Sequence, residues 1–116
     1  MTDMFSVSSE LQDDSCGVVV LAGEVDIYTA PRFKESMLDL LDGGAQTLVI
    51  DLSGVTFIDS TALGVLIGGL RRVNDAGGAM ALVVTTPAVE RVLTITGLDR
   101  VFTIRDTRAA AVEALA

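Results

Sequence analysis

The sequence predicts a single α/β domain whose sheet is mostly parallel. Its 116 residues suit one domain. Short runs rich in Val, Ile and Leu alternate with segments of helical periodicity, and glycines or Thr-Pro pairs separate them. Strands that alternate with helices are joined by right-handed crossovers, which pack the helices on a parallel sheet. We therefore expect one domain over residues 1–116, with a mixed sheet of four to five strands and about four helices.

The first half of the chain contains two apolar strands with a helix between them. Residues 17–22 and 47–52 are β-branched runs that predict buried strands. Between them, Thr29 and Pro31 predict a helix start, because Thr is a good N-cap and proline is tolerated in the first turn. One apolar stripe of this helix consists of Phe33, Met37, Leu40 and Leu41. The pair Gly43-Gly44 ends the helix.

The second half of the chain repeats the alternation. Helices are expected at residues 60–76, 86–96 and 107–115, and strands at residues 80–84 and 101–104. Glycines follow the first two of these helices, as is typical of a helix end. We also expect an edge strand at residues 5–9.

Composition excludes several classes of function. The chain has 8 Lys and Arg against 16 Asp and Glu, and its net charge of −8 argues against a nucleic-acid partner. It has no histidine, which removes the usual general base and the usual metal ligand. The single cysteine, Cys16, excludes an internal disulfide and a cysteine-based metal cluster. We therefore expect no metal and no cofactor.

The chain also lacks the patterns of a membrane or secreted protein. No uncharged stretch reaches the ~20 apolar residues that a membrane-spanning helix needs. The first residues lack the basic region and apolar core of a secretory signal. We therefore expect a cytoplasmic protein without a membrane partner.

The segment from Asp51 to Gly68 carries the most informative pattern. A strand feeds a loop, and Asp59-Ser60-Thr61 stands where the next helix begins. These three residues could serve only as helix caps. Alternatively, Ser60 accepts a phosphoryl group, because a helix N-terminus offers unpaired N–H groups and the positive end of the dipole. The carboxyl edge of parallel strands is also where sites gather in α/β sheets.

Four motifs of the chain resemble those of one known family. Residues 57–66, Phe-Ile-Asp-Ser-Thr-Ala-Leu-Gly-Val-Leu, resemble the phosphorylation segment of the anti-sigma factor antagonists, which are small STAS-domain proteins. Residues 23–26, Gly-Glu-Val-Asp, resemble the motif that follows a strand in the family. Residues 74–78 resemble the exit of its second helix, and residues 87–98 its third helix and the following turn. The motifs occur in the family's order and cover nearly the whole chain.

The resemblance implies roles for individual residues. Ser60 matches the serine that is phosphorylated in the family, and Asp59 precedes it at the helix start. Asp26 matches an aspartate that lies near that serine and helps to engage the partner, and we expect Glu24 to lie at the same edge of the sheet. One departure is Ala62, which stands where the family usually has glycine. Alanine suits a helix, but this change could alter the fit to a kinase.

The resemblance also implies the partners. The unphosphorylated protein would bind an anti-sigma factor and free the sigma factor. That partner would itself be a serine kinase, which binds ATP and Mg²⁺ and transfers phosphate to Ser60. A serine phosphatase would restore the active form. The protein itself would be no enzyme.

A helical wheel of residues 60–76 adds an observation that is independent of the family. The apolar face expected to meet the sheet consists of Ala62, Val65, Leu66, Gly69, Leu70 and Val73. Gly64 and Gly68 lie on the opposite face of the helix, and Ser60 and Ile67 lie beside them. Each glycine lowers the stability of the helix by roughly 1 kcal/mol relative to alanine. Either a neighbouring helix of the same chain packs closely there, or the backbone of a partner does. The candidate partner-binding residues are therefore Glu24, Asp26, Asp59, Thr61, Gly64, Ile67 and Gly68.

Two other functions remain open on the sequence. A STAS subunit could serve as a scaffold or small-ligand sensor in a larger complex, with Ser60 acting only as a cap. A small hydrolase that uses Ser60 is disfavoured, because the chain has no histidine and no Gly-x-Ser-x-Gly, Walker or Gly-x-Gly-x-x-Gly motif in the required place. Phosphate uptake from a serine kinase would distinguish a switch from a scaffold.

Overall fold

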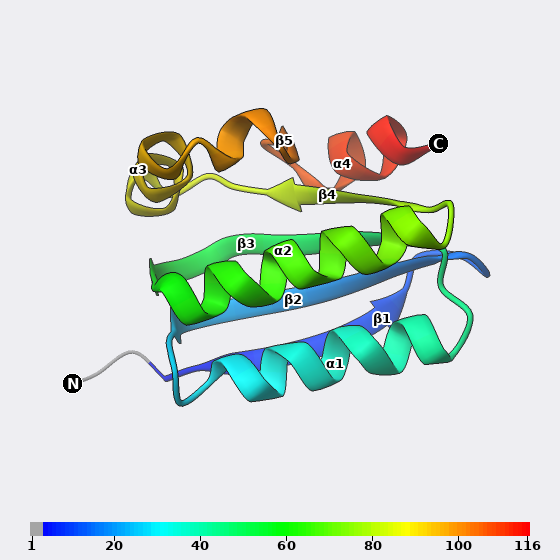
Figure 1. Ribbon diagram of the computed structural model, residues 1–116, viewed down its shortest axis with the longest axis horizontal. Helices are drawn as coiled ribbons and strands as arrows, with labels where there is room; N and C mark the ends of the chain where they lie inside the picture. Colours follow the sequence, from blue (N-terminus) through cyan, green and yellow to red (C-terminus); the bar gives the residue numbers. More distant parts are fainter. Residues whose placement is uncertain (1–3) are drawn as a thin grey trace.

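The structure, a computed structural model, describes residues 4–116 and contains a five-stranded sheet in the order β1-β2-β3-β4-β5 (Figure 1). The strands are β1 (Ser6–Leu11), β2 (Cys16–Val25), β3 (Thr47–Ile58), β4 (Ala79–Val83) and β5 (Thr103–Arg105). Strand β1 runs antiparallel to β2, and the remaining neighbours pair in parallel. The predicted α/β fold with a mostly parallel mixed sheet is thereby confirmed.

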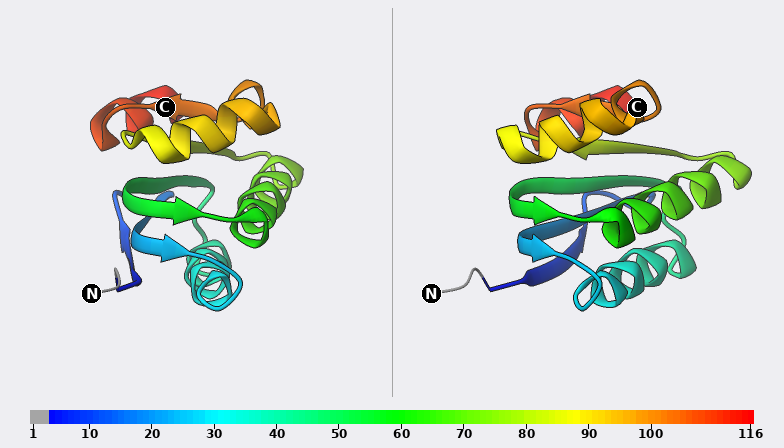
Figure 2. Two further views of the ribbon diagram at one scale, coloured as in Figure 1. Left: turned by 90° about the vertical axis from the view of Figure 1, so that its left-hand side faces the viewer. Right: turned by 60° about the vertical axis from the view of Figure 1, so that its left-hand side comes forward.

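Three helices connect the parallel strands, and a fourth follows the last of them. These are α1 (Ala30–Asp42), α2 (Ser60–Asp75), α3 (Pro87–Thr96), which leads into a 3₁₀ turn (Leu98–Arg100), and α4 (Arg108–Leu115). The crossovers through α1, α2 and α3 all advance by one strand in the same direction, and right-handed crossovers of that kind place their helices on one face. Figure 2 shows α1 and α2 on one side of the sheet and α4 on the other.

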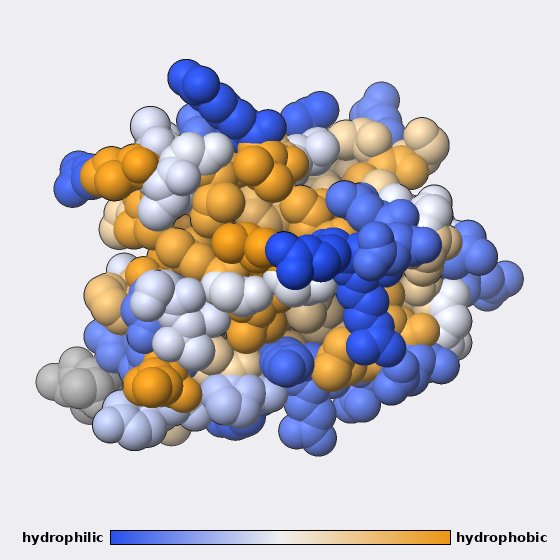
Figure 3. Space-filling view, in the orientation of Figure 1, coloured by the Kyte–Doolittle hydropathy of each residue, from blue (hydrophilic) through white to orange (hydrophobic). Residues whose placement is uncertain are grey.

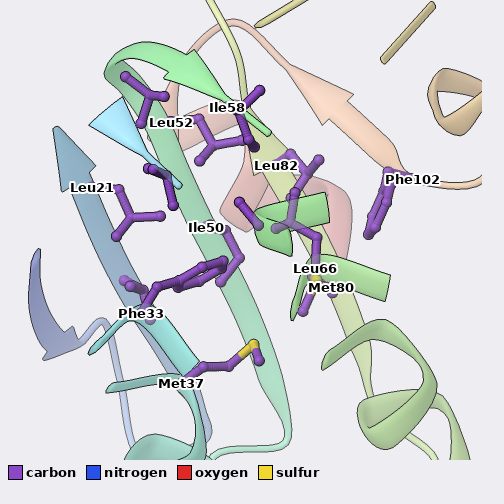
Figure 4. Packing of buried hydrophobic residues seen from close by; sticks show 14 of the residues in the cluster. Leu21, Phe33, Met37, Ile50, Leu52, Ile58, Leu66, Met80, Leu82 and Phe102 are labelled. Atoms are coloured by element: carbon purple, nitrogen blue, oxygen red, sulfur yellow. The ribbon is translucent and has the colours of Figure 1, made fainter. Parts of the chain in front are cut away.

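Each face of the sheet has its own apolar core. Beneath α1, α2 and α3, Phe33 and Leu66 pack with Ile50 of β3 and Leu82 of β4, all fully buried (Figure 4). Met37 and Met80 fill the same core. Beneath α4, a smaller cluster consists of Cys16, Val18, Val49, Ala81, Val83 and Ala111. The larger core therefore anchors the start of α2 against the sheet.

Strand β3 is longer than the sequence predicts. It extends to Ile58, whereas a loop was expected from residue 53 onward, so that expectation is wrong. Polar and small side chains suggested a loop, but the backbone of this stretch continues to pair with β2 as far as Val25. The pairing shifts register between Val20 and Ala22 and again between Gly23 and Glu24. Gly23 has φ +84°, a left-handed conformation that disfavours any other residue there.

Smaller differences from the prediction concern the bounds of the two outer strands, β1 and β5. The edge strand is displaced to Ser6–Leu11 from the predicted 5–9. Strand β5 begins at Thr103 and not at residue 101, because a turn at Val101 and a bend at Phe102 follow the 3₁₀ helix. Among residues 4–116, no helix is both long and apolar enough to span a membrane.

Candidate partner-binding site at the start of α2

Asp59 joins two segments at the carboxyl edge of the sheet. Its Oδ1 accepts a hydrogen bond from the backbone N–H of Ala62 at 3.1 Å and so caps α2. Its Oδ2 accepts one from the N–H of Ile27 at 3.1 Å, and its own N–H donates to the carbonyl of Val25 at 3.1 Å. The end of β2 and the start of α2 are therefore held side by side.

Asp26 organises the turn between β2 and α1. Its Oδ1 accepts hydrogen bonds from the backbone N–H groups of Tyr28 at 2.9 Å and Thr29 at 3.1 Å. The Asp26 N–H donates to the Thr29 hydroxyl at 2.9 Å, so this hydroxyl makes no cap bond to α1, although Thr29 stands at the predicted N-cap position. Glu24 is exposed and lies opposite Phe57 in the β2–β3 pairing. Both carboxylates therefore occur at the same sheet edge as the start of α2.

Ser60 and Thr61 form the first exposed residues of α2. Within residues 4–116, the Ser60 hydroxyl makes no hydrogen bond, and both oxygens of the neighbouring Asp59 carboxylate already accept backbone bonds. The hydroxyl is therefore accessible, and within residues 4–116 it makes no hydrogen bond to a side chain of the kind that activates a nucleophile. The same residues contain no group of three or more His, Cys, Asp or Glu side chains that could hold a metal ion.

The glycines of α2 fall into two environments. Within the described residues 4–116, a Cβ added at Gly64 or Gly68 would meet no heavy atom of another segment within 4 Å. The interpretation that a neighbouring helix of the same chain packs against these two glycines is therefore wrong. Gly69 is the packed glycine, because a Cβ there would meet the ends of Met37 and Met80. We call the side of α2 that carries Gly64 and Gly68 its open face. Ile67, next to Gly68 in the sequence, is half-buried.

The residues of α2 that face the sheet also differ from the apolar face that the helical wheel predicts. The buried residues are Ala62, Leu63, Leu66, Gly69 and Val73. Val65 and Leu70 are only half-buried, whereas Leu63 is buried although the expected face did not include it. The helix is therefore rotated so that Leu63 turns inward.

Three exposed apolar residues at the same edge of the sheet as the start of α2 were not predicted as site residues. Ile27 and Tyr28 are 61% and 86% exposed, and Phe57 is 49% exposed. The first two follow Asp26 in the turn that Asp59 holds, and the third lies near the end of β3. The sequence signal that could have identified this exposed surface is the adjacent pair Ile27-Tyr28, which lies between the polar turn residues Asp26 and Thr29. Figure 3 shows hydrophobic surface over the first half of α2 and toward α3, and hydrophilic surface where α2 ends.

An α/β domain with an exposed hydroxyl, an ordered acidic turn and exposed apolar side chains at one sheet edge has the features of a protein-binding domain. The model of the STAS domain family matches residues 10–111. The chain therefore belongs to the STAS domain family.

The chain is similar to two relatives and one solved structure that are named anti-sigma factor antagonists. It is 38% identical over 86 residues to the anti-sigma-B factor antagonist of Bacillus subtilis, covering 74% of this chain and 78% of that one. It is 31% identical over 99 residues to the anti-sigma F factor antagonist of Paenibacillus polymyxa, covering 84% and 85%. The crystal structure of an anti-sigma factor antagonist from Mycobacterium paratuberculosis superposes with a TM-score of 0.87 at 30% identity, covering 97% and 95% of the two chains.

Proposed function

We propose that this protein is an anti-sigma factor antagonist that is switched by phosphorylation of Ser60. The observation that carries the proposal is the accessible Ser60 hydroxyl in the first turn of α2, beside the exposed Ile27 and Tyr28. The names of the relatives support the same function. The protein acts by binding and is a substrate of another enzyme, with no catalytic activity of its own.

The partner is an anti-sigma factor that is also a serine kinase. In the unphosphorylated state, the antagonist docks through the start of α2 and the β2–α1 turn, and the anti-sigma factor releases its sigma factor. The candidate contact residues are Glu24, Asp26, Asp59, Thr61, Gly64, Ile67 and Gly68, together with the exposed Ile27 and Tyr28. The net charge of −8 favours a protein partner over a nucleic acid, and we place the exchange in the cytoplasm.

Phosphorylation is a transfer from ATP that the partner binds with Mg²⁺. The Ser60 oxygen forms a bond to the γ-phosphorus, the bond from that phosphorus to the β,γ-bridging oxygen breaks, and ADP leaves. The hydroxyl proton passes to a base of the kinase. A serine phosphatase hydrolyses the phosphoserine and restores the binding form.

The phosphate acts as a switch through its charge. It adds about −1.5 to −2 charges at pH 7 to an edge that already contains Glu24, Asp26 and Asp59. The positive end of α2 tolerates this charge while the protein is free in water. Within a docked interface, a charge without a partner is strongly unfavourable, by about 3–5 kcal/mol. The phosphorylated protein should therefore release the anti-sigma factor.

The test uses the serine kinases of the source organism that have a histidine-kinase-like ATPase fold, each purified with Mg-ATP. We expect one of them to phosphorylate the wild-type protein at Ser60, as located by mass spectrometry, and the Thr61→Ala control to be phosphorylated as well. Calorimetry should show tight binding of the wild type and Ser60→Ala, and much weaker binding of Ser60→Asp. Phosphate only at other residues, or equal affinity of all three forms, would exclude the switch and favour a scaffold.

A further inference from the structure

A groove runs between α1 and α2 on the face that carries Ser60. Its volume is about 480 Å³, and it is lined by Lys34, Met37, Leu38, Thr61, Gly64, Val65, Gly68, Gly69 and Arg72. Thr61 follows Ser60 directly, so the groove is continuous with the candidate site. From Thr61 to Arg72 its α2 wall is about 16 Å long at about 1.5 Å per helical residue.

Two residues of the α2 wall of this groove, Gly64 and Gly68, have no side chain. They lie about one turn apart, and a Cβ on either would meet no heavy atom of another segment of residues 4–116 within 4 Å. Alanine at both positions would favour the helix without any internal clash. The described fold therefore gives no reason for the two glycines, and an approaching backbone gives one.

The charge of the groove is opposite to that of the protein. Its charged lining residues are Lys34 and Arg72, and none of its lining residues is acidic, although the chain has a net charge of −8. Arg72 pairs with Asp42 at 3.3 Å at one end, in an exposed contact that contributes little. Lys34 is the only lysine of the sequence, and it forms no ion pair with any residue from 4 to 116. The groove therefore holds one cation that lacks a counterion of its own.

We propose that this groove receives a segment of the anti-sigma factor that carries an Asp or Glu side chain, with Lys34 as the charge partner. The inference rests on the proposed function and adds the chemistry of the partner segment. An extended segment of about five residues would span the groove at about 3.3 Å per residue. Its backbone passes over Gly64 and Gly68, and its carboxylate meets the Lys34 ammonium. The groove is only about half enclosed, and its lining includes Thr61, the neighbour of Ser60, which suits a docked segment rather than an enclosed small ligand.

The single lysine allows a direct test by cross-linking. A zero-length carbodiimide joins a lysine amine to a carboxylate as an amide, and we would apply it to the complex of the full chain with the kinase that phosphorylates Ser60. We expect a cross-linked peptide that joins Lys34 to an Asp or Glu of the partner. Lys34→Arg keeps the charge but loses the amine, so it should retain the affinity and lose this cross-link.

Charge reversal provides an independent readout. Lys34→Glu should weaken binding of the kinase at least tenfold, and exchange of the cross-linked partner carboxylate for Lys should restore much of that loss. Arg71→Glu is the matched control, because Arg71 is exposed on α2, the other helix beside the groove, but is not one of the residues that line the groove. It changes the net charge by the same amount and should alter affinity much less.

The outcomes separate the inference from the proposed function. If no serine kinase binds or phosphorylates the wild type, the proposed function is wrong. If the wild type binds and Ser60→Asp does not, but Lys34→Glu binds as the wild type does and no cross-link to Lys34 forms, only the groove assignment is wrong. Equal losses of affinity for Lys34→Glu and Arg71→Glu would show an effect of net charge and would also overturn the groove assignment.

Discussion

The carboxylate of Asp59 accepts a hydrogen bond from the backbone N–H of Ile27 across 32 positions of sequence. The same carboxylate caps α2 through Ala62. One side chain therefore fixes the position of the exposed Ile27 and Tyr28 relative to Ser60. The geometry of the candidate interface depends on this link, because the turn and the helix belong to different crossovers of the sheet.

Replacement of Asp59 should cost stability. Asp59→Ala removes the helix cap and the bond to Ile27, and we expect a loss of about 1–2 kcal/mol in the free energy of unfolding. Urea unfolding would measure this loss. Asp75→Ala, at the exposed end of α2, is the control and should change stability by less than about 0.5 kcal/mol. An Asp59→Ala protein as stable as the wild type would contradict the capping role.

Asp26 offers a way to separate its charge from its hydrogen bonds. Asp26→Asn keeps an oxygen that can accept from Tyr28 and Thr29, so its stability should stay within about 0.5 kcal/mol of the wild type. Asp26→Ala loses these bonds and should be destabilised by about 1–2 kcal/mol. If the charge also engages the partner, Asp26→Asn should bind the kinase about tenfold more weakly, or about 1.4 kcal/mol. Unchanged affinity of this stable variant would restrict Asp26 to the turn.

The sequence was sufficient to predict the order of the elements but not all of the site. Two kinds of local signal located these elements. Thr, Pro and Asp-Ser residues predicted the starts of α1, α2 and α3, and β-branched runs predicted the central strands. The extension of β3 was missed because Ser53 and Thr56 look like loop residues, whereas strand pairing uses the backbone alone. The exposure of Ile27 was missed because apolar residues usually predict burial, whereas Ile27 lies in a turn that binds Asp59 through the backbone and its side chain is exposed.

Tyr28 should contribute to binding and not to folding. Its side chain is 86% exposed, so Tyr28→Ala should leave the free energy of unfolding within about 0.5 kcal/mol of the wild type. An exposed tyrosine at the centre of an interface can contribute about 2 kcal/mol, so affinity for the kinase should fall about thirtyfold. Calorimetry beside a thermal melt measures both quantities. Tyr28→Phe should retain most of the affinity, and an unaltered affinity of Tyr28→Ala would place the interface elsewhere.

Two neighbouring glycines of α2 provide a matched pair of variants. Gly68 is open, so Gly68→Leu should be accommodated and should gain up to ~0.8 kcal/mol from helix propensity. Gly69 faces the ends of Met37 and Met80 in the core, so Gly69→Leu should lose about 1–3 kcal/mol through overpacking. A comparison of their urea unfolding curves would measure the difference.

The same pair tests whether the open face of α2 binds the partner. A leucine at Gly68 would fill the space that we assign to the partner backbone, so affinity for the kinase should fall at least tenfold, or about 1.4 kcal/mol, although the fold gains stability. Gly69→Leu changes the interior, so its folded fraction should bind nearly as the wild type does. Stability and affinity would then move in opposite directions for Gly68→Leu. If this variant binds as tightly as the wild type, the open glycines do not belong to the interface, and the docking surface lies around Tyr28 and Ser60 alone.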